Sequence, residues 1–281
     1  MRIIEASEVT RIVAELFKKA NYYPEPEVKE ALLCAAEREG GERCRAALCR
    51  LAENIDLAAE VGVPVCQDTG MAVVFADVGC EVHVSGDTLE NAVNAGVRKG
   101  YTEGYMRLSV VSDPLYDRKN TNDNTPAILH IRTVPGDKLT ITCAPKGFGS
   151  ENMSAVKMLN PSATEDDVIS FVTETVKKAG SNPCPPIFVG VGIGGDFEYS
   201  AILAKRALTR PIGDSHPDAR YAALEKKLLC AVNAIGIGAA GFGGDVTALA
   251  VKCEYYPTHI AGLPLAVNIN CHAVRHASAT L

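Results

Sequence analysis

The spacing of apolar residues predicts helices through the first sixty positions. A first helix is expected behind Ser7, a candidate N-cap, and should close near Asn21. The apolar positions that define its buried face are Val9, Ile12, Val13, Leu16 and Phe17. Two further helices are predicted over 26–39 and 43–60. The chain is therefore expected to begin with a helical layer.

After residue 70 the pattern changes to short apolar runs that are typical of strands. The runs MAVVFADVG (71–79) and EVHV (81–84) precede a helical pattern over 88–99. The runs AILHIRTV (127–134) and KLTITCA (138–144) flank the sequence Pro-Gly-Asp, which predicts a β-hairpin. Between these parts lies the long polar stretch DPLYDRKNTNDNTPA, and long ordered loops are often functional.

The second half alternates between helical and strand patterns. Helices are predicted over 151–159, 164–179, 197–208 and 217–234. The runs IFVGVGI (187–193), TALAVKCEYY and LPLAVNI are expected to form buried strands. We therefore predict a mixed α/β fold, in which a helical N-terminal layer is followed by mixed strands and helices. No linker or repeat interrupts the pattern, so residues 1–281 are expected to form one domain.

Composition and charge exclude several classes of protein. The chain has 281 residues, of which 47% are hydrophobic and 22% charged, as in an ordinary globular protein. Its net charge of −6 offers no electrostatic reason to expect a nucleic-acid partner. Charged residues interrupt the N-terminus, and no apolar run is long enough to span a membrane. We therefore expect a cytoplasmic protein, whose ten cysteines are thiols or metal ligands rather than disulfides.

A glycine pattern resembles a dinucleotide-binding turn but lacks its context. Gly190, Gly192 and Gly195 form G-x-G-x-x-G between a predicted strand and a predicted helix. The segment after that helix, TRPIGDSHPDAR, is turn-like and does not supply the expected second strand with its acidic residue. A second match, which begins at Gly236, has no helical pattern directly after it. We therefore disfavour an NAD-dependent oxidoreductase, although a tight turn near some ligand remains open.

The cysteines divide into two groups by their surroundings. Seven lie on or beside helical and strand patterns and are expected to be small buried residues: Cys34, Cys44, Cys49, Cys80, Cys143, Cys230 and Cys253. The other three, Cys66, Cys184 and Cys271, lie in turns or directly after a predicted strand, beside polar residues. No C-x-x-C pair occurs, which disfavours zinc ribbons and ferredoxin-type runs. From the residues alone, a buried structural role stays open for these three as well.

Five longer motifs, taken in order, resemble the N-terminal catalytic domain of class I fumarate hydratases. They are VPVCQDTG, DPLYDRKNTNDNTPA, KGFGSENMS, NPCPPIFVGVGIGGDFE and THIAGLPLAVNINCHAVRHA. The same domain is similar to the α subunit of L-tartrate dehydratase. The resemblance implies a hydro-lyase that holds a [4Fe–4S] cluster through Cys66, Cys184 and Cys271. Three thiolates leave one iron open, and that iron can act as a Lewis acid toward a substrate.

The resemblance also implies roles for five residues around a C4-dicarboxylate substrate. Gln67 and Asp68 would contact substrate, with Asp68 taking part in proton transfer. Arg107 would bind a carboxylate through a bidentate fork, and the Gly149 amide and His259 would complete the pocket. Each has a plain alternative. Asp68 could form an Asx turn, Arg107 could be a solvated surface residue, Gly149 a simple turn and His259 structural.

The resemblance further implies a partner and a choice of substrate. Single-chain class I fumarases continue into a second domain that carries a threonine base, whereas this sequence stops at Leu281. We therefore expect a heteromer with a separate β subunit, active in the tricarboxylic acid cycle. The loops DRKNTNDNTPA and KGFGSENMS are fumarase-like, whereas a tartrate enzyme would be expected to carry GVPW-type and GRSK-type sequences. Fumarate is thus favoured, with tartrate or mesaconate as alternatives, and a non-catalytic iron–sulfur protein as another.

Overall fold

Two four-stranded sheets, each with its own hydrophobic core, organise the chain. A computed structural model describes residues 1–281, and it separates into two compact units. Unit 1 comprises 1–25, 57–148 and 275–281, and unit 2 comprises 26–56 and 149–274. Both units combine helices and mixed sheets, so the predicted mixed α/β class is confirmed. None of the helices has both the length and the apolar character needed to cross a lipid bilayer.

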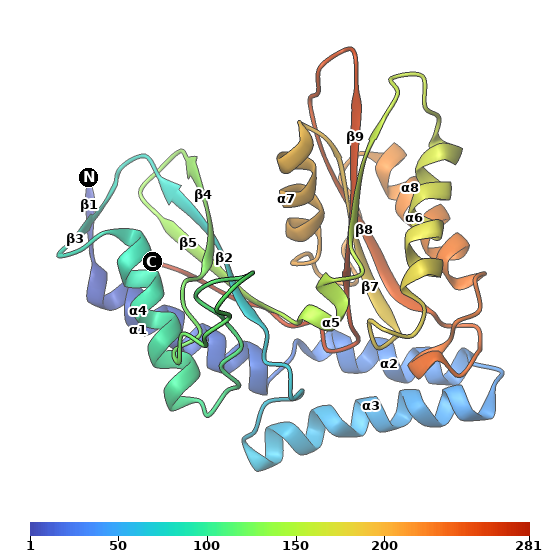
Figure 1. Cartoon of the computed structure of the whole chain (residues 1–281), viewed down its shortest axis with the longest axis horizontal. Helices are drawn as coiled ribbons and strands as arrows, with labels where there is room; N and C mark the ends of the chain where they lie inside the picture. Colours follow the sequence, from blue (N-terminus) through green and yellow to red (C-terminus); the bar gives the residue numbers. More distant parts are fainter. The chain divides into compact units, whose positions relative to one another are not determined.

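Unit 1 is a mixed sheet with helices on one face. Its strand order is β10-β5-β2-β4, with β2 parallel to β4 and antiparallel to β5. The strands are β2 (Met71–Gly79), β4 (Ile128–Val134), β5 (Leu139–Lys146) and β10 (Ala277–Thr280). Helices α1 (Ala6–Tyr22) and α4 (Leu89–Glu103) pack together on this sheet (Figure 1). A small parallel pair, β1 (Arg2–Glu5) and β3 (Val82–Ser85), completes the unit.

The core of unit 1 follows from the helical spacing seen in the sequence. Val9, Val13 and Phe17 of α1 are fully buried, and α1 packs against α4 and β5. The N-cap prediction was wrong, because α1 already begins at Ala6 and Glu5 precedes it without a side-chain cap. Ser7 is therefore part of the first turn rather than its cap.

The predicted hairpin between β4 and β5 does not form. Strand β2 lies between them and pairs with both. The turn that joins them instead crosses the end of β2, where Gly79 N donates to Lys138 O at 2.8 Å and Glu81 N donates to Gly136 O at 3.0 Å. A Cβ at Gly79 would lie 2.4 Å from Gly136 O, so this crossing requires glycine. The apolar strand β2 therefore displaces a local pairing in favour of a buried central position.

Unit 2 is a second mixed sheet, with helices on both faces. Its order is β6-β9-β7-β8, in which β9 is antiparallel to β6 and β7, and β8 is parallel to β7. The strands are β6 (Ala155–Leu159), β7 (Ile187–Gly194), β8 (Ala248–Tyr256) and β9 (Leu263–Asn270). Figure 1 shows α7 (Phe197–Ala207) on one face and α6 (Glu165–Ala179) with α8 (Ala219–Asn233) on the other. Residues 151–159, predicted as helical, form the end of a short helix and then β6, because their backbone pairs with β9.

Two further helices pack near the start of β7. Helices α2 (Pro26–Arg38) and α3 (Glu42–Val61) match the predicted ranges within three residues at each end. Leu32 of α2 and Leu48 of α3 are fully buried in a cluster that also contains Phe188 of β7 and Ala250 of β8. The three helices predicted in the first sixty residues are thus present, with α1 in unit 1 and α2 in unit 2. The short helix α5 (Phe148–Glu151) begins where unit 1 gives way to unit 2.

Candidate active site

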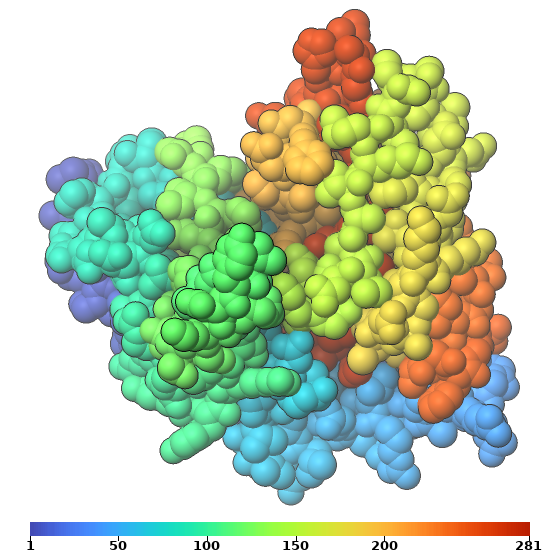
Figure 2. Space-filling view, viewed as in Figure 1, coloured from blue at the N-terminus to red at the C-terminus, as the bar shows by residue number.

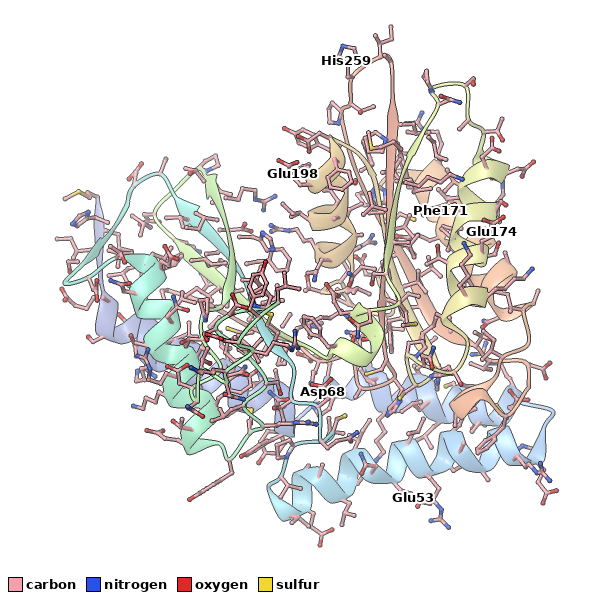
Figure 3. The ribbon with its side chains drawn as sticks, viewed as in Figure 1. Glu53, Asp68, Phe171, Glu174, Glu198 and His259 are labelled. Atoms are coloured by element: carbon pink, nitrogen blue, oxygen red, sulfur yellow. The ribbon has the colours of Figure 1, made fainter.

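In unit 1, the Asp68 carboxylate is fixed by backbone amides. Its Oδ1 accepts a hydrogen bond from Gly70 N at 3.0 Å, which forms the Asx turn weighed above. Its Oδ2 accepts another from Phe148 N at 2.9 Å, from the KGFGS motif. A Cβ at Gly147 would lie 3.1 Å from that oxygen, so a side chain there would crowd the carboxylate. The Asx turn therefore coexists with a second contact that ties two predicted motifs together; Figure 3 shows Asp68 in the segment before β2.

The backbone carbonyls after Asp68 are held from three other segments. The Tyr101 hydroxyl of α4 donates to both Thr69 O and Gly70 O at 3.0 Å. Asn124 Nδ2 donates to Gly70 O at 3.2 Å, and Arg275 Nη2 donates to Asp68 O. Tyr101 is fully buried, and burial raises the pKa of its hydroxyl, which therefore stays a neutral donor. These three residues fix the turn that carries Gln67 and Asp68.

The same network places Arg107. Thr69 Oγ1 donates to Arg107 O at 3.1 Å, and Asn124 Oδ1 accepts from Ser109 N at 2.8 Å. Asn124 therefore joins the segment after Arg107 to the turn after Asp68, from a fully buried position. The Arg107 side chain is exposed, and its guanidinium forms no ion pair. An unpaired cation beside a fixed carboxylate turn is available for an anionic ligand.

The long polar loop from 113 to 127 therefore has a structural purpose. Its asparagines support the Arg107 segment: Asn124 as described, and Asn120 through Nδ2, which donates to Leu108 O at 2.8 Å. The outer part of the loop is exposed, and Figure 2 shows it in bright green on the surface. Long ordered loops of this kind are often functional, and this one positions a predicted substrate residue.

In unit 2, the sheet brings the Cys184 and Cys271 segments side by side. Cys184 precedes β7 and Cys271 follows β9, and these strands are antiparallel with Phe188 opposite Asn270. Both cysteines therefore lie at the same edge of the sheet. His272 connects them, because its backbone N lies 3.3 Å and its Nδ1 lies 3.0 Å from Cys184 O. The prediction that Cys271 directly follows a strand is confirmed.

The Cys184 turn is strained and supported by the second glycine motif. Cys184 has a φ of 54°, in the left-handed region that side-chain-bearing residues rarely adopt. Behind it, Ala240 N donates to Pro185 O at 2.8 Å. A Cβ at Gly241 would lie 2.6 Å from Ser181 Cβ. The glycines after Gly236 therefore allow close packing against the turn that carries Cys184.

Glu39 of unit 2 holds the other side of this glycine loop. Its carboxylate accepts hydrogen bonds from the backbone N of Gly41, Asp245 and Val246 at 2.9–3.1 Å. Burial opposes ionisation of Glu39, but these amide bonds outweigh it and lower its pKa. The loop amides are thus satisfied by a side chain of the chain itself rather than left for a phosphate.

The first glycine motif packs a helix onto the sheet. A Cβ at Gly190 would lie 2.0 Å from Ala204 O, and one at Gly192 would lie 2.0 Å from Ser200 O. Helix α7 therefore sits directly on these two glycines. Its N-terminus is capped by the Asp196 side chain, which accepts from Tyr199 N at 3.0 Å. The segment directly after α7 forms no strand, as expected, and the parallel strand β8 follows only after α8. The end of α7 where a pyrophosphate would bind already holds the Asp196 carboxylate.

Burial separates the remaining cysteines differently from the prediction. Cys44, Cys143 and Cys253 are buried, as expected, and burial raises the pKa of all three thiols, that of Cys44 to about 11. Cys34, Cys80 and Cys230 are exposed, which corrects the expectation that they fill the core. Cys34 and Cys230 lie on the outer faces of α2 and α8, and Cys80 lies in the turn after β2. None of the ten cysteines forms a disulfide.

His259 lies at the opposite end of β9 from Cys271. It sits in the exposed loop between β8 and β9, where Ala261 N donates to its Nδ1 at 3.1 Å (Figure 3). The eight residues of β9 separate it from Cys271, which at about 3.3 Å per residue amounts to more than 20 Å. Within unit 2, the structure therefore places His259 apart from the two cysteines, and a contact between His259 and substrate stays a prediction.

Gly149 lies in α5, at the start of unit 2. A Cβ there would meet Asn182 O at 3.7 Å, an ordinary contact, unlike the crowded position of Gly147. The structure therefore shows a close carboxylate approach at Gly147 and Phe148, where the acceptor is Asp68. An amide contact between Gly149 and substrate stays a prediction.

Comparison with known proteins gives the family. The model of the family described as fumarate hydratase (fumerase) matches residues 10–280. The chain belongs to the fumarate hydratase family. It is 41% identical, over 96% of each chain, to a Methanocaldococcus jannaschii protein provisionally named L(+)-tartrate dehydratase subunit alpha. It is 31% identical to the L(+)-tartrate dehydratase subunit alpha of Escherichia coli strain UTI89, over 80% of this chain and 75% of that protein.

The suspected relationship is thus confirmed, and this member of the fumarate hydratase family is a hydro-lyase. Cys184 and Cys271 have the chemistry that an iron–sulfur cluster requires, and their positions account for part of its ligand set. Thiolates are the usual ligands of iron–sulfur clusters, and unit 2 brings two accessible cysteine segments to one sheet edge. No three His, Cys, Asp or Glu side chains lie together in a geometry that could hold a metal ion.

Three residues that support the candidate site were not predicted from the sequence. They are Tyr101, Asn124 and Arg275, which together hold the turn after Asp68. Asn124 and Arg275 lie inside motifs that carried the resemblance, so their positions were visible but their partners were not. Nothing in the sequence marks Tyr101 as part of the site, because a tyrosine on a buried helix face is ordinarily a core residue.

Proposed function

We propose that the chain is the iron–sulfur subunit of a fumarate hydratase, which adds water to fumarate to give (S)-malate. The observation that carries this proposal is the edge of unit 2, where β7 and β9 align the Cys184 and Cys271 segments. Cys66 would be the third ligand. It is the partly exposed cysteine of unit 1 that directly precedes the Gln67–Asp68 turn, whereas Cys143 is buried and Cys80 lies at the far end of β2.

The connectivity of the chain supports the choice of Cys66. Arg275, four residues after Cys271, donates to the carbonyl of Asp68, two residues after Cys66. A four-residue connection spans at most about 14 Å, and a [4Fe–4S] cluster requires thiolates from separate parts of the chain to converge. The segments that carry Cys66 and Cys271 are thus tied through one short stretch of chain.

The bound cluster would supply a Lewis-acidic iron for the hydroxyl and carboxylate of malate. The chain's own residues would bind and orient the rest. Arg107 is exposed, unpaired and held by Thr69, so its planar fork can take a carboxylate. The Asp68 carboxylate, fixed by two amides, would hold or move a proton on the substrate. Gln67, exposed beside Cys66, would donate through its amide.

A separate β subunit would supply the remaining groups that the reaction needs. Fumarate carries two carboxylates, and anti addition of water needs a base across the double bond from the hydroxyl. In unit 1, Arg107 and Asp68 would serve one end of such a dianion. We propose that the partner brings a second cationic contact and the base. The "subunit alpha" names of the two relatives support a two-chain enzyme.

L-Tartrate is the second candidate substrate, because both relatives described above carry tartrate dehydratase names. The fumarase-like loops DRKNTNDNTPA and KGFGSENMS favour fumarate. Their structural roles, which are to position Arg107 and Asp68, would serve either dicarboxylate. The choice therefore has to be made by assay.

The proposal is tested by anaerobic co-expression with a candidate β subunit, followed by assays on fumarate, L-tartrate and mesaconate. We expect about four irons and four sulfides per chain, and water addition to fumarate. Cys184→Ser should abolish the four-iron cluster, whereas Cys230→Ser, which changes another exposed cysteine, should leave it intact. A Cys184→Ser protein with four irons and full activity would contradict the ligand set. Activity on L-tartrate but not on fumarate would show that the chain is a tartrate dehydratase subunit instead.

The same preparation tests the need for the partner. The chain alone, with its cluster loaded, should hydrate fumarate negligibly, and adding the β subunit should raise kcat by at least the 10²–10⁴-fold that a general base contributes. Substantial activity of the isolated chain would disprove the two-chain proposal. NAD should neither raise the Tm nor support turnover, since Asp196 occupies the helix end that a nucleotide would need.

A further inference from the structure

Arg275 is a buried cation in unit 1 that has no anion. It lies between β9 and β10 and is 3% exposed, although arginine is almost never fully buried unless it is paired. It forms no ion pair with any aspartate or glutamate of the chain. A buried charge without a partner is unfavourable. The anion that would compensate Arg275 is therefore expected to come from a bound group rather than from the polypeptide.

The hydrogen bonds of Arg275 show which of its guanidinium nitrogens have no acceptor. Nη2 donates to Asp68 O, whereas Nε and Nη1 are buried and have no acceptor. The Asp68 carboxylate, which belongs to the turn that Arg275 contacts, is already used by the amides of Gly70 and Phe148. The guanidinium therefore holds the Asp68 turn with one nitrogen and keeps two donor nitrogens unused.

The position of Arg275 in the chain points to the acceptor. It follows Cys271 by four residues, and it contacts the turn that begins at Cys66. A cluster bound by three thiolates carries net negative charge, and its sulfurs accept hydrogen bonds that set its stability and potential. A resident cluster can use a buried donor permanently. A substrate that exchanges at every turnover is better served by the exposed Arg107.

We propose that Arg275 is the counter-ion of the iron–sulfur cluster, offsetting its charge and donating hydrogen bonds to it from the Asp68 turn. This inference rests on the proposed function. It predicts that Arg275 stabilises the loaded protein, whereas in the empty protein its unpaired charge gives no net benefit. A purely structural role, holding Asp68 O, would instead stabilise both forms alike.

The test compares Arg275→Gln with wild type in the full chain, empty and anaerobically loaded. Glutamine keeps a donor for Asp68 O but removes the charge. The loaded variant should lose its cluster about 10–100-fold faster under a chelator, as for other residues that support metal ligands, and its reduction potential should become more negative. The Tm of the empty variant should equal or exceed that of wild type. Arg275→Lys, which keeps the charge, should lie between.

Arg98→Gln is the matched control, because Arg98 is an exposed arginine of unit 1 that pairs with Asp123. It should release the cluster at the wild-type rate. Equal cluster loss in Arg275→Gln and wild type would overturn the inference. So would an empty Arg275→Gln protein that is destabilised as much as the loaded one. An unchanged cluster with a weaker fumarate-induced spectral shift would assign Arg275 to substrate instead. A wild-type chain that never takes up four irons would refute the proposed function itself.

Discussion

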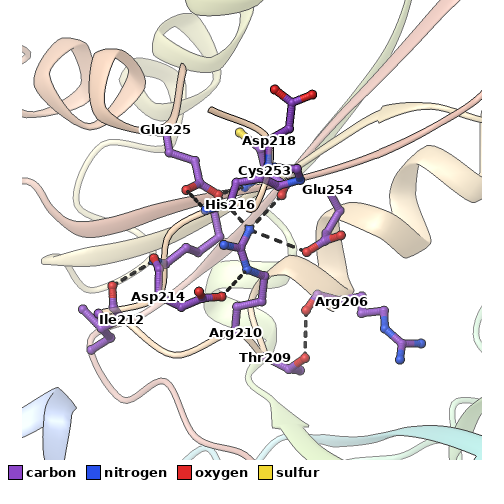
Figure 4. Close-up of polar contacts among 12 residues, drawn as sticks. Arg206, Thr209, Arg210, Ile212, Asp214, His216, Asp218, Glu225, Cys253 and Glu254 are labelled. Carbon is purple, nitrogen blue, oxygen red and sulfur yellow. Dashed lines mark hydrogen bonds and ion pairs between the residues drawn. The ribbon is translucent and has the colours of Figure 1, made fainter. Parts of the chain in front are cut away.

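Two arginines with little exposed surface, one in each unit, differ in how their charge is neutralised: Arg210 is partly buried and Arg275 is buried. Arg210 of unit 2 lies within a group of carboxylates, with Glu225 at 2.8 Å, Asp214 at 3.0 Å and Glu254 at 3.6 Å (Figure 4). It also donates to Cys253 O at 2.9 Å, and one of its nitrogens, Nη2, has no partner. Arg275 of unit 1 has one carbonyl, no carboxylate and two nitrogens without partners.

The difference separates a charge that stabilises the fold through its own ion pairs from a charge that is available to a bound ligand. Burial lowers the pKa of Arg210, but its hydrogen bonds and charge contacts with Asp214 and Glu225 outweigh this and raise it. Glu225 also accepts from the backbone N of Cys253, so the pair is completed inside unit 2. A cation that the fold satisfies by itself stabilises that fold. A cation that the fold leaves without an anion can instead interact with an anionic ligand.

The largest effect on stability is expected where the satisfied pair is broken. Arg210→Met should leave the buried Glu225 carboxylate without its ion-pair partner, which costs about 3–5 kcal/mol of unfolding free energy. Urea unfolding of the empty chain measures it. The matched change Arg275→Met should not lower the stability of the empty chain. Equal losses in the two variants would erase the distinction between the arginines.

A third arginine, Arg107, should affect catalysis rather than stability. It is exposed and has no ion pair, so Arg107→Lys should leave the unfolding free energy and the cluster unchanged. Loss of the planar fork should lower kcat/KM for fumarate at least tenfold, about 1.4 kcal/mol in the transition state. Steady-state kinetics of the complete enzyme measure this. Unchanged kinetics would return Arg107 to the ordinary surface residues.

Glu39 extends the comparison to a buried anion that is satisfied by backbone amides and the Cys44 side chain, without a cation. Its pKa is lowered in the folded state from the ordinary 4.5, so its stabilisation is present above that value and is lost as the pH falls through the lowered folded value. Glu39→Gln retains an acceptor oxygen and should cost about 1 kcal/mol at neutral pH. The gap to wild type should close in acid. A gap that stayed constant from pH 7 to pH 3 would contradict the role assigned to the amide bonds.

The smallest effect is expected for an exposed pair. Arg11 and Glu15 of α1 are 3.0 Å apart, one helical turn from each other, and both side chains are more than half exposed. Arg11→Ala should therefore change the unfolding free energy by only about 0.3–0.5 kcal/mol, and less at high salt. Urea unfolding at two salt concentrations measures it. A loss as large as that of Arg210→Met would mean that burial does not decide the value of these arginines.

Local patterns of the sequence were sufficient for most elements. Strand β2 was predicted with its observed bounds, and α2, α3, α7 and α8 lie within three residues of theirs, because their apolar spacing has a clear period of its own. The sequence pattern gave wrong predictions where pairing with a distant strand decides the structure. Residues 155–159 become a strand by pairing with β9, and the β4–β5 hairpin yields to the insertion of β2.

The candidate site divides in the same way. The sequence by itself determined the family, through five motifs whose order is specific, and with it the expectations for Cys66, Asp68 and Arg107. Only the tertiary structure decided which carboxylate meets which amide, that Asn124 ties Arg107 to the Asp68 turn, and that Arg275 is buried without an anion. These contacts join residues tens to hundreds of positions apart. Residue type and spacing carry no record of such pairings, because they arise only when the folded chain satisfies, or leaves unsatisfied, each buried polar group.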